Sequence, residues 1–117
     1  MNEKQKLGQY GERIAAAFLM EKGYKVIKLN YRCRIGEIDI IALKDEFLVF
    51  CEVKTRTGNS CGRPAEAVTR EKLMHIEKAS RHFMTYGNWT GYQPRIDVIE
   101  IIMEAGSAIN HIISVTE

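Results

Sequence analysis

Residues 36–56 read GEIDIIALKDEFLVFCEVKTR, and the rest of the predicted fold is built around them. Its two halves, 36–44 and 46–56, are rich in Ile, Val and Phe, and a short polar turn around residues 44–46 separates them. β-Branched and aromatic residues favour strands, and a short polar turn joins antiparallel neighbours. The stretch therefore predicts a β-hairpin whose strands are largely buried.

Charged residues interrupt this otherwise apolar hairpin. Asp39 lies in the first strand, and Glu52 and Lys54 lie in the second. Directly opposed residues of an antiparallel pair point to the same face, and two registers keep the aliphatic residues together. One register places Asp39 opposite Glu52, and the other places Asp39 opposite Phe50. In both registers Asp39, Glu52 and Lys54 share one face, whereas a slip by one residue would bury charges among aliphatic side chains.

Two carboxylates and a lysine on one face indicate a metal site. Carboxylates that face each other with Cβ atoms ~5 Å apart repel each other unless a cation lies between them. Mg²⁺ and Mn²⁺ prefer such oxygen ligands, and Mg²⁺ keeps further positions for water and substrate phosphate. Lys54 could then orient or deprotonate a water or steady the charge on a phosphate. The alternative is an exposed sheet face that carries ordinary Glu–Lys pairs.

The remaining segments extend the hairpin into an α/β fold in the order α-β-β-β-α-β-β. Leu7, Tyr10, Ile14 and Phe18 recur at helical spacing near the start of the chain. The connection from the second hairpin strand to the next strand is long enough for a parallel crossover. We expect one domain over residues 1–117, with a mixed central sheet flanked by helices. Helices are predicted over 3–22 and 65–86, and strands over 24–32, 36–44, 46–56, 95–103 and 111–115.

Candidate site residues also lie outside the hairpin. Glu12 falls at the edge of the apolar arc of the first helix, beside small residues that would let this helix approach the sheet closely. Lys72 continues the apolar stripe of the second helix, so its base points toward the sheet. Each could instead be an ordinary boundary residue. The candidates for contact with nucleic-acid phosphates are Lys72, Arg32, Arg56 and Arg63.

Charge distribution, cysteine content and apolar runs indicate the class of protein and its compartment. The chain has 117 residues and a formal net charge of +2, but residues 1–34 hold eight Lys and Arg against three acidic residues. Such a basic end could attract a polyanion. Three cysteines without a CxxC pair fit a reduced, cytoplasmic protein. Because no apolar run approaches 18 residues and the start of the chain lacks a signal-peptide pattern, we expect neither a membrane span nor export.

The spacing Asp39…Glu52-Val53-Lys54 resembles the PD-(D/E)xK motif of the restriction-endonuclease-like nucleases, with Ile38 in place of the proline. Nearly the whole chain resembles the YraN family of small bacterial proteins. The matching motifs, in order, are Gly8-x-x-Gly11-Glu12-x-x-Ala15, Gly23-Tyr24, Asn30-Tyr31-Arg32, Gly36-Glu37-Ile38-Asp39-Ile40-Ile41-Ala42, Phe50-Cys51-Glu52-Val53-Lys54-Thr55-Arg56, Gly62-Arg63-Pro64 and Lys72.

This resemblance implies a restriction-endonuclease-like core similar to that of archaeal Holliday-junction resolvases. It implies that Asp39, Glu52 and Glu12 bind or orient a metal ion and that Lys54 is the catalytic lysine. The predicted function is a Mg²⁺- or Mn²⁺-dependent endonuclease that acts on DNA, with branched or junction DNA as a candidate substrate and a homodimer as a candidate assembly. Two alternatives stay open: a non-catalytic nucleic-acid-binding module that retains the fold, and a domain that recognises only a protein partner.

Overall fold

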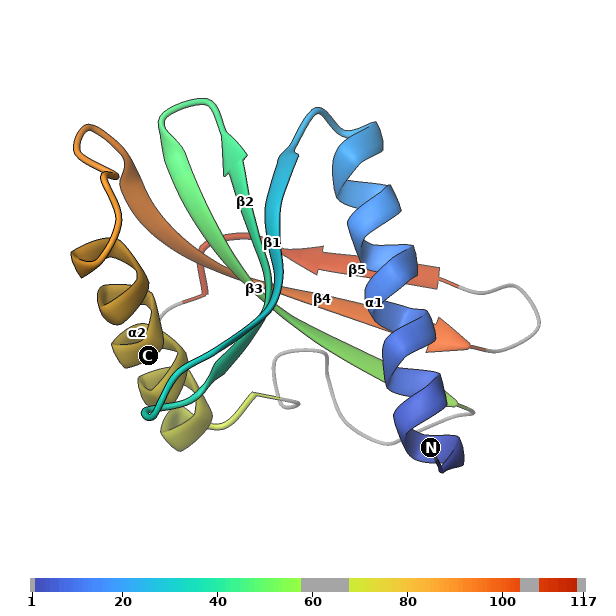
Figure 1. Ribbon diagram of the computed structural model, residues 1–117. Helices are drawn as coiled ribbons and strands as arrows, with labels where there is room; N and C mark the ends of the chain where they lie inside the picture. Colours follow the sequence, from blue (N-terminus) through green and yellow to red (C-terminus); the bar gives the residue numbers. More distant parts are fainter. Residues whose placement is uncertain (1, 58–67, 104–107, 116–117) are drawn as a thin grey trace.

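The computed structural model describes residues 2–57, 68–103 and 108–115. The order of elements is the predicted one, α-β-β-β-α-β-β (Figure 1). The predicted site residue Arg63 and the first residues of the predicted second helix lie outside the described residues. The helices are α1 (Glu3–Glu21) and α2 (Arg70–Thr85), and the strands are β1 (Lys25–Arg32), β2 (Glu37–Lys44), β3 (Phe47–Thr57), β4 (Gln93–Met103) and β5 (Ala108–Ile112).

Two predicted boundaries were wrong, and each error has a local cause. Helix α2 begins at Arg70 because Thr69 has an extended backbone and caps the helix, its side chain accepting a hydrogen bond of 3.1 Å from the Lys72 amide. The last strand lies three residues earlier than predicted. It ends because Ser114 adopts a left-handed conformation (φ 60°), and its amide donates a hydrogen bond to the Asp97 side chain.

The strands form one mixed sheet in the order β1-β2-β3-β4-β5. Strands β3 and β4 are parallel and are joined through α2, whereas the other neighbours are antiparallel. A parallel pair requires a long crossover, and the second helix provides it. The α/β class with a mixed sheet flanked by two helices is therefore confirmed.

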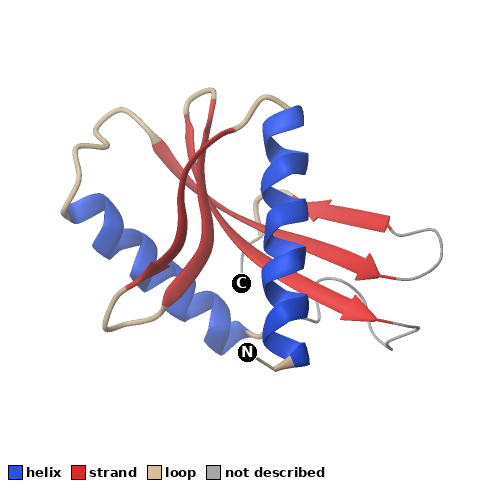
Figure 2. Ribbon diagram, turned by 45° about the vertical axis from the view of Figure 1, so that its right-hand side comes forward, coloured by secondary structure: helices blue, strands red, loops and turns tan. Residues whose placement is uncertain are grey.

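The two helices cover opposite faces of this sheet. In Figure 2 the strands pass behind α1 and in front of α2. The pleat explains the division, because alternate residues of β3 enter two separate apolar clusters. Val49 and Cys51 pack with Leu19 of α1, and Leu48 and Phe50 pack with Ile76 of α2.

A glycine sets the closeness of α1 to β3. A Cβ atom on Gly11 would lie 1.8 Å from Oγ1 of Thr55, so only glycine permits this approach. The next residue along the helix is Glu12, which is half-buried. The close packing at Gly11 therefore brings the Glu12 carboxylate to the sheet.

Candidate active site at the fork between β2 and β3

The site lies where two neighbouring strands separate. Strands β2 and β3 pair from Lys44 and Phe47 up to Ile40 and Cys51, which is the register that places Asp39 opposite Glu52. Beyond this point β2 continues along β1 to Glu37, and β3 continues along β4 to Thr57. Figure 1 shows the lower ends of the two strands diverging. Asp39 is thus the first residue of β2 past the paired region.

Asp39 is held at this fork by the backbone of the neighbouring strand. The Val53 amide donates a hydrogen bond of 2.8 Å to Asp39 Oδ2, so the carboxylate takes the place of a main-chain acceptor. The pKa of Asp39 is raised to about 8. Burial is the largest cause, the hydrogen bond and charge of Glu52 add to the rise, and the hydrogen bond from the Val53 amide opposes it. Asp39 therefore keeps its proton more readily than an ordinary aspartate at neutral pH.

Asp97, on strand β4, shows that burial alone does not give an aspartate a raised pKa. Its side chain is fully buried and accepts hydrogen bonds from Arg95 at 2.9 and 3.0 Å, from His111 at 2.8 Å and from the Ser114 amide at 3.0 Å. Burial raises the pKa of Asp97, but these donors outweigh it and the net shift is downward. The nearest hydrogen-bonding side chain of Asp39 is another carboxyl group, that of Glu52, rather than an arginine or a histidine. Two neighbouring carboxyl groups with a raised pKa are the pattern expected of a functional site.

Glu52 is paired with Lys72 of α2. Lys72 Nζ lies 2.6 Å from Glu52 Oε2, and the side chains are 52% and 7% exposed, respectively. Burial lowers the pKa of Lys72, but the hydrogen bond and charge of Glu52 reverse the shift, so its pKa is raised. The sequence predicted Lys72 as a phosphate contact, and the structure places its ammonium beside the Glu52 carboxylate.

Glu12 approaches the pair from the α1 side. Burial raises its pKa, as do the charges of Glu37 and Glu52, while a hydrogen bond from the Asn30 side chain and the charge of Arg32 oppose the rise. Asn30 lies within β1 with a left-handed backbone (φ 52°), a conformation that asparagine tolerates better than most residues. Sequence reasoning missed Asn30 as a site residue, and its only signal was its place in the Asn30-Tyr31-Arg32 motif.

Lys54 does not join this group. It follows Glu52 by two residues and so has the same face of β3, but its side chain is exposed. Within the described ranges no ion pair connects Lys54 with Asp39 or Glu52. The structure therefore brings Asp39, Glu52 and Glu12 together and leaves Lys54 exposed at the edge of this group of carboxylates.

The predicted phosphate-binding arginines differ in their surroundings. Arg32 is exposed and lies 3.5 Å from Glu37. Arg56 is largely buried, at 13% exposed, and its Nε lies 2.7 Å from Oε2 of Glu100 on β4. Arg32 consequently faces solvent close to the carboxylates, whereas Arg56 takes part in a buried ion pair.

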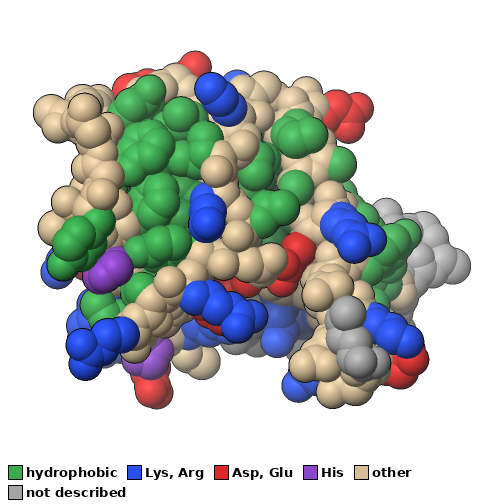
Figure 3. All heavy atoms as spheres, in the orientation of Figure 1, with side chains coloured by type: hydrophobic (Ala, Val, Ile, Leu, Met, Phe, Trp, Pro, Cys, Tyr) green, Lys and Arg blue, Asp and Glu red, His purple; other side chains and the backbone are tan. Residues whose placement is uncertain are grey.

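Hollows lie beside Glu12 and beside Lys72, the two side chains that approach the carboxylate pair from α1 and from α2. Glu12, Asn30 and Arg32 line one of about 440 Å³ on the α1 side, together with Gln5, Gly8 and Gln9. Lys72 and Glu37 line the other, of about 250 Å³, together with Gly36, Thr69, Glu71, His75 and Ile76. Figure 3 shows Lys and Arg side chains along the lower part of this face, with acidic side chains between them.

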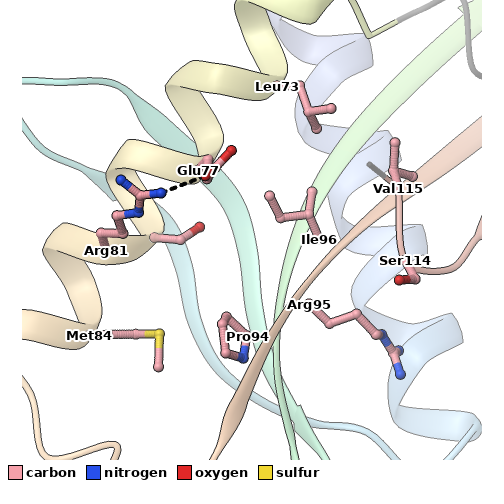
Figure 4. A pocket seen from close by; sticks show the side chains of 10 residues that line it. Leu73, Glu77, Arg81, Met84, Pro94, Arg95, Ile96, Ser114 and Val115 are labelled. Atoms are coloured by element: carbon pink, nitrogen blue, oxygen red, sulfur yellow. Dashed lines mark hydrogen bonds and ion pairs between the residues drawn. The ribbon is translucent and has the colours of Figure 1, made fainter. Parts of the chain in front are cut away.

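A third hollow lies elsewhere on the molecule. It has a volume of about 400 Å³ and lies between α2, the start of β4 and the segment after β5 (Figure 4). Its wall carries Leu73, Met84 and Ile96, and an ion pair of 2.7 Å between Arg81 and Glu77. Because Asp39, Glu52 and Glu12 do not line it, this hollow is separate from the candidate site.

The carboxylate pair fits a Mg²⁺ or Mn²⁺ ion in its donor atoms. Mg²⁺ takes one or two protein carboxylates and completes its coordination with water and phosphate oxygens. Asp39 and Glu52 offer such a pair of hard oxygen ligands, and the raised pKa of Asp39 reflects two neighbouring carboxyl groups that a divalent cation would stabilise. In the described part of the chain no three His, Cys, Asp or Glu side chains lie close enough to ligate one ion. Glu12 is therefore placed as an outer neighbour of the pair.

Comparison with known proteins assigns the chain to a family. The model of the uncharacterised protein family UPF0102, which is the YraN family, matches residues 11–101. The chain belongs to this family. A UPF0102 protein of Caldanaerobacter subterraneus is 43% identical over 115 residues, covering 95% of this chain and 94% of the relative. One of Caldicellulosiruptor bescii is 42% identical over 113 residues, covering 96% and 94%.

The matched region contains the whole candidate site. Glu12, Asp39, Glu52, Lys54 and Lys72 all lie between the first and last matched residues, so the fork is part of what UPF0102 relatives align with. The resemblance to the YraN family is thus confirmed over most of the chain.

Neither described helix is long and apolar enough to cross a membrane.

Proposed function

We propose that this UPF0102 protein is a metal-dependent endonuclease that hydrolyses phosphodiester bonds in DNA. The observation that supports it is the adjacent pair of carboxyl groups of Asp39 and Glu52 at the fork, because they offer the hard oxygen ligands that a divalent ion prefers and a half-exposed lysine is their counter-ion. A bound Mg²⁺ or Mn²⁺ would supply a water of lowered pKa and polarise a phosphate oxygen.

The residues of the chain have distinct parts in this proposal. Asp39 and Glu52 would hold the ion, and the Val53 amide fixes the Asp39 carboxylate in place. Glu12, itself held by Asn30, would orient water beside the ion. Lys54 reaches in from the edge of this group on its flexible stem to steady the negative charge that develops on the phosphate. Such electrostatic stabilisation is most effective where water is partly excluded.

Basic residues around the fork support DNA as the substrate. Arg32 and Lys72 line the two hollows beside the carboxylates, and residues 1–34 carry an excess of Lys and Arg. Phosphate contacts of this kind hold a nucleic acid in position without reading its sequence. Cleavage of a branched junction on two strands needs two active sites, so we propose a homodimer on such a substrate, acting in the reducing cytoplasm.

A nuclease assay with matched variants tests the proposal. Purified protein is incubated with four-way-junction, flapped and linear DNA in Mn²⁺, Mg²⁺ or EDTA. We expect metal-dependent cleavage that Asp39→Ala and Lys54→Ala reduce by at least about 100-fold, in line with the loss of a key charge-stabilising group. Glu46→Ala removes an exposed carboxylate at the turn of the same hairpin and should keep full activity. Cleavage that survives in both site variants refutes the assignment.

The second candidate is a nucleic-acid-binding module without catalysis. The ion pair of Lys72 with Glu52 favours it, because a permanent lysine would neutralise this carboxylate without a metal. It predicts DNA binding that weakens steeply with salt and no change in that binding on Glu52→Gln. Calorimetric titration with Mn²⁺ separates the two candidates, because only the nuclease requires a metal site.

A further inference from the structure

Lys72 and Glu52 form a pair whose two members differ greatly in freedom. The Glu52 side chain is 7% exposed and belongs to a central strand, whereas the Lys72 side chain is 52% exposed and lies in the first turn of α2. A lysine of this kind can turn its ammonium into solvent on a four-carbon stem. The lysine can therefore leave the pair, and the glutamate cannot.

The ammonium occupies the place where a divalent cation would have to bind. Lys72 Nζ lies 2.6 Å from Glu52 Oε2, and the Asp39 side chain is hydrogen-bonded to the same carboxyl group. An ammonium and a divalent ion repel each other and compete for the same oxygen lone pairs. Beside Lys72 lies the hollow of about 250 Å³, which also reaches Gly36, Thr69 and His75 and gives the released side chain room.

We propose that Lys72 is an exchangeable counter-ion of the carboxylate pair. It holds Glu52 while no metal is bound, leaves Glu52 when a divalent ion binds, and is then free to contact a DNA phosphate. This inference rests on the proposed metal site and adds a coupling between metal binding and DNA binding. By linkage the coupling is reciprocal, so DNA also raises the affinity for metal.

Calorimetric titration of Mn²⁺ into the intact protein tests the exchange. Lys72→Met keeps the length of the stem and removes the competing ammonium, so we expect Mn²⁺ to bind about tenfold more tightly, the value of one charge-assisted hydrogen bond. Lys78→Met is the matched control, because Lys78 is an exposed lysine of the same helix. It should leave the Mn²⁺ affinity within about twofold of the wild type. An affinity of Lys72→Met equal to or below that of the wild type overturns the inference.

DNA binding provides a second, independent readout. Fluorescence anisotropy of a labelled four-way junction is measured in Ca²⁺ and in EDTA. Lys72→Met should weaken binding in Ca²⁺ by about fivefold, the scale of one phosphate contact, and match Lys78→Met in EDTA. An equal loss in both media would show that Lys72 contacts phosphate permanently, which contradicts the exchange.

The outcomes separate this inference from the proposed function. If the wild type binds Mn²⁺ and Lys72→Met binds it no more tightly, the exchange is wrong and the metal site stands. If neither protein binds Mn²⁺, the metal site itself is wrong, and the exchange falls with it.

Discussion

Replacing Asp39 by asparagine should stabilise the metal-free protein. An acid whose pKa is raised by folding binds its proton more tightly in the folded state than in the unfolded state. Its effect on stability is therefore absent at low pH. The effect becomes unfavourable as the pH rises above the pKa of the unfolded state, and it levels off above the pKa of the folded state. For Asp39 these limits are 3.8 and about 8. Asparagine stays neutral throughout and can still accept from the Val53 amide and donate to Glu52.

The magnitude follows from the same two pKa values of Asp39. Each pH unit between them costs about 1.4 kcal/mol, so at pH 7 the accumulated loss is roughly 4 kcal/mol. Urea unfolding in EDTA at several pH values from 5 to 8.5 measures it. We expect Asp39→Asn to exceed the wild type in stability by an amount that grows with pH and reaches a plateau above about pH 8.

Glu46→Gln supplies the control for this measurement, because Glu46 is an exposed carboxylate of the same hairpin. Its effect should stay within about 0.5 kcal/mol, as for most surface substitutions. If Asp39→Asn is less stable than the wild type, or if the difference does not change with pH, the explanation of the carboxylate pair is refuted. A gain in stability with a loss of metal binding would be the trade-off expected of a functional site.

Three further predictions concern the packing, the second buried aspartate and the metal. Gly11→Ala should destabilise the protein by about 1–3 kcal/mol, because the new Cβ overlaps Thr55. Gly8→Ala, whose Cβ meets nothing within 4 Å, should instead stabilise the protein by up to about 1 kcal/mol. Thermal unfolding of the two variants and the wild type measures both effects. Asp97→Asn should destabilise by about 3 kcal/mol at pH 7, because it leaves a buried cation uncompensated. Since the pKa of Asp97 is lowered by folding, its contribution is present above the ordinary value and is lost as the pH falls below it, so acid unfolding of the variant should be less steep. Mn²⁺ affinity should rise with pH up to about 8, because the ion displaces the proton on Asp39, and calorimetry in buffers of different ionisation enthalpy should count about one proton released.

The hairpin and its charged face could be predicted because they depend on local pattern. Alternation along 36–56 determines which residues share a face, and the cost of burying charge among aliphatic side chains removes the slipped registers. The observed register, with Ile40 opposite Cys51, is one of the two that this reasoning allowed. The choice between them depended on the turn, which the sequence pattern did not specify.

The remaining features of the site depend on how distant segments pack. Lys72 lies on Glu52 because of the angle at which α2 crosses the sheet, and no local pattern of residues sets that angle. Arg56 faces Glu100 because β4 runs parallel to β3 in one particular register. The left-handed backbone of Asn30 goes against the preference of a strand, and such exceptions are expected at functional sites.

Calorimetric titration with Mn²⁺ at pH 8 shows whether Asp39 and Glu52 together form a site for one divalent ion. We expect one ion bound per chain for the wild type and for Glu46→Gln, and none for Asp39→Asn or Glu52→Gln. Binding that is absent from the wild type, or that persists with equal affinity in both site variants, would contradict the proposed site.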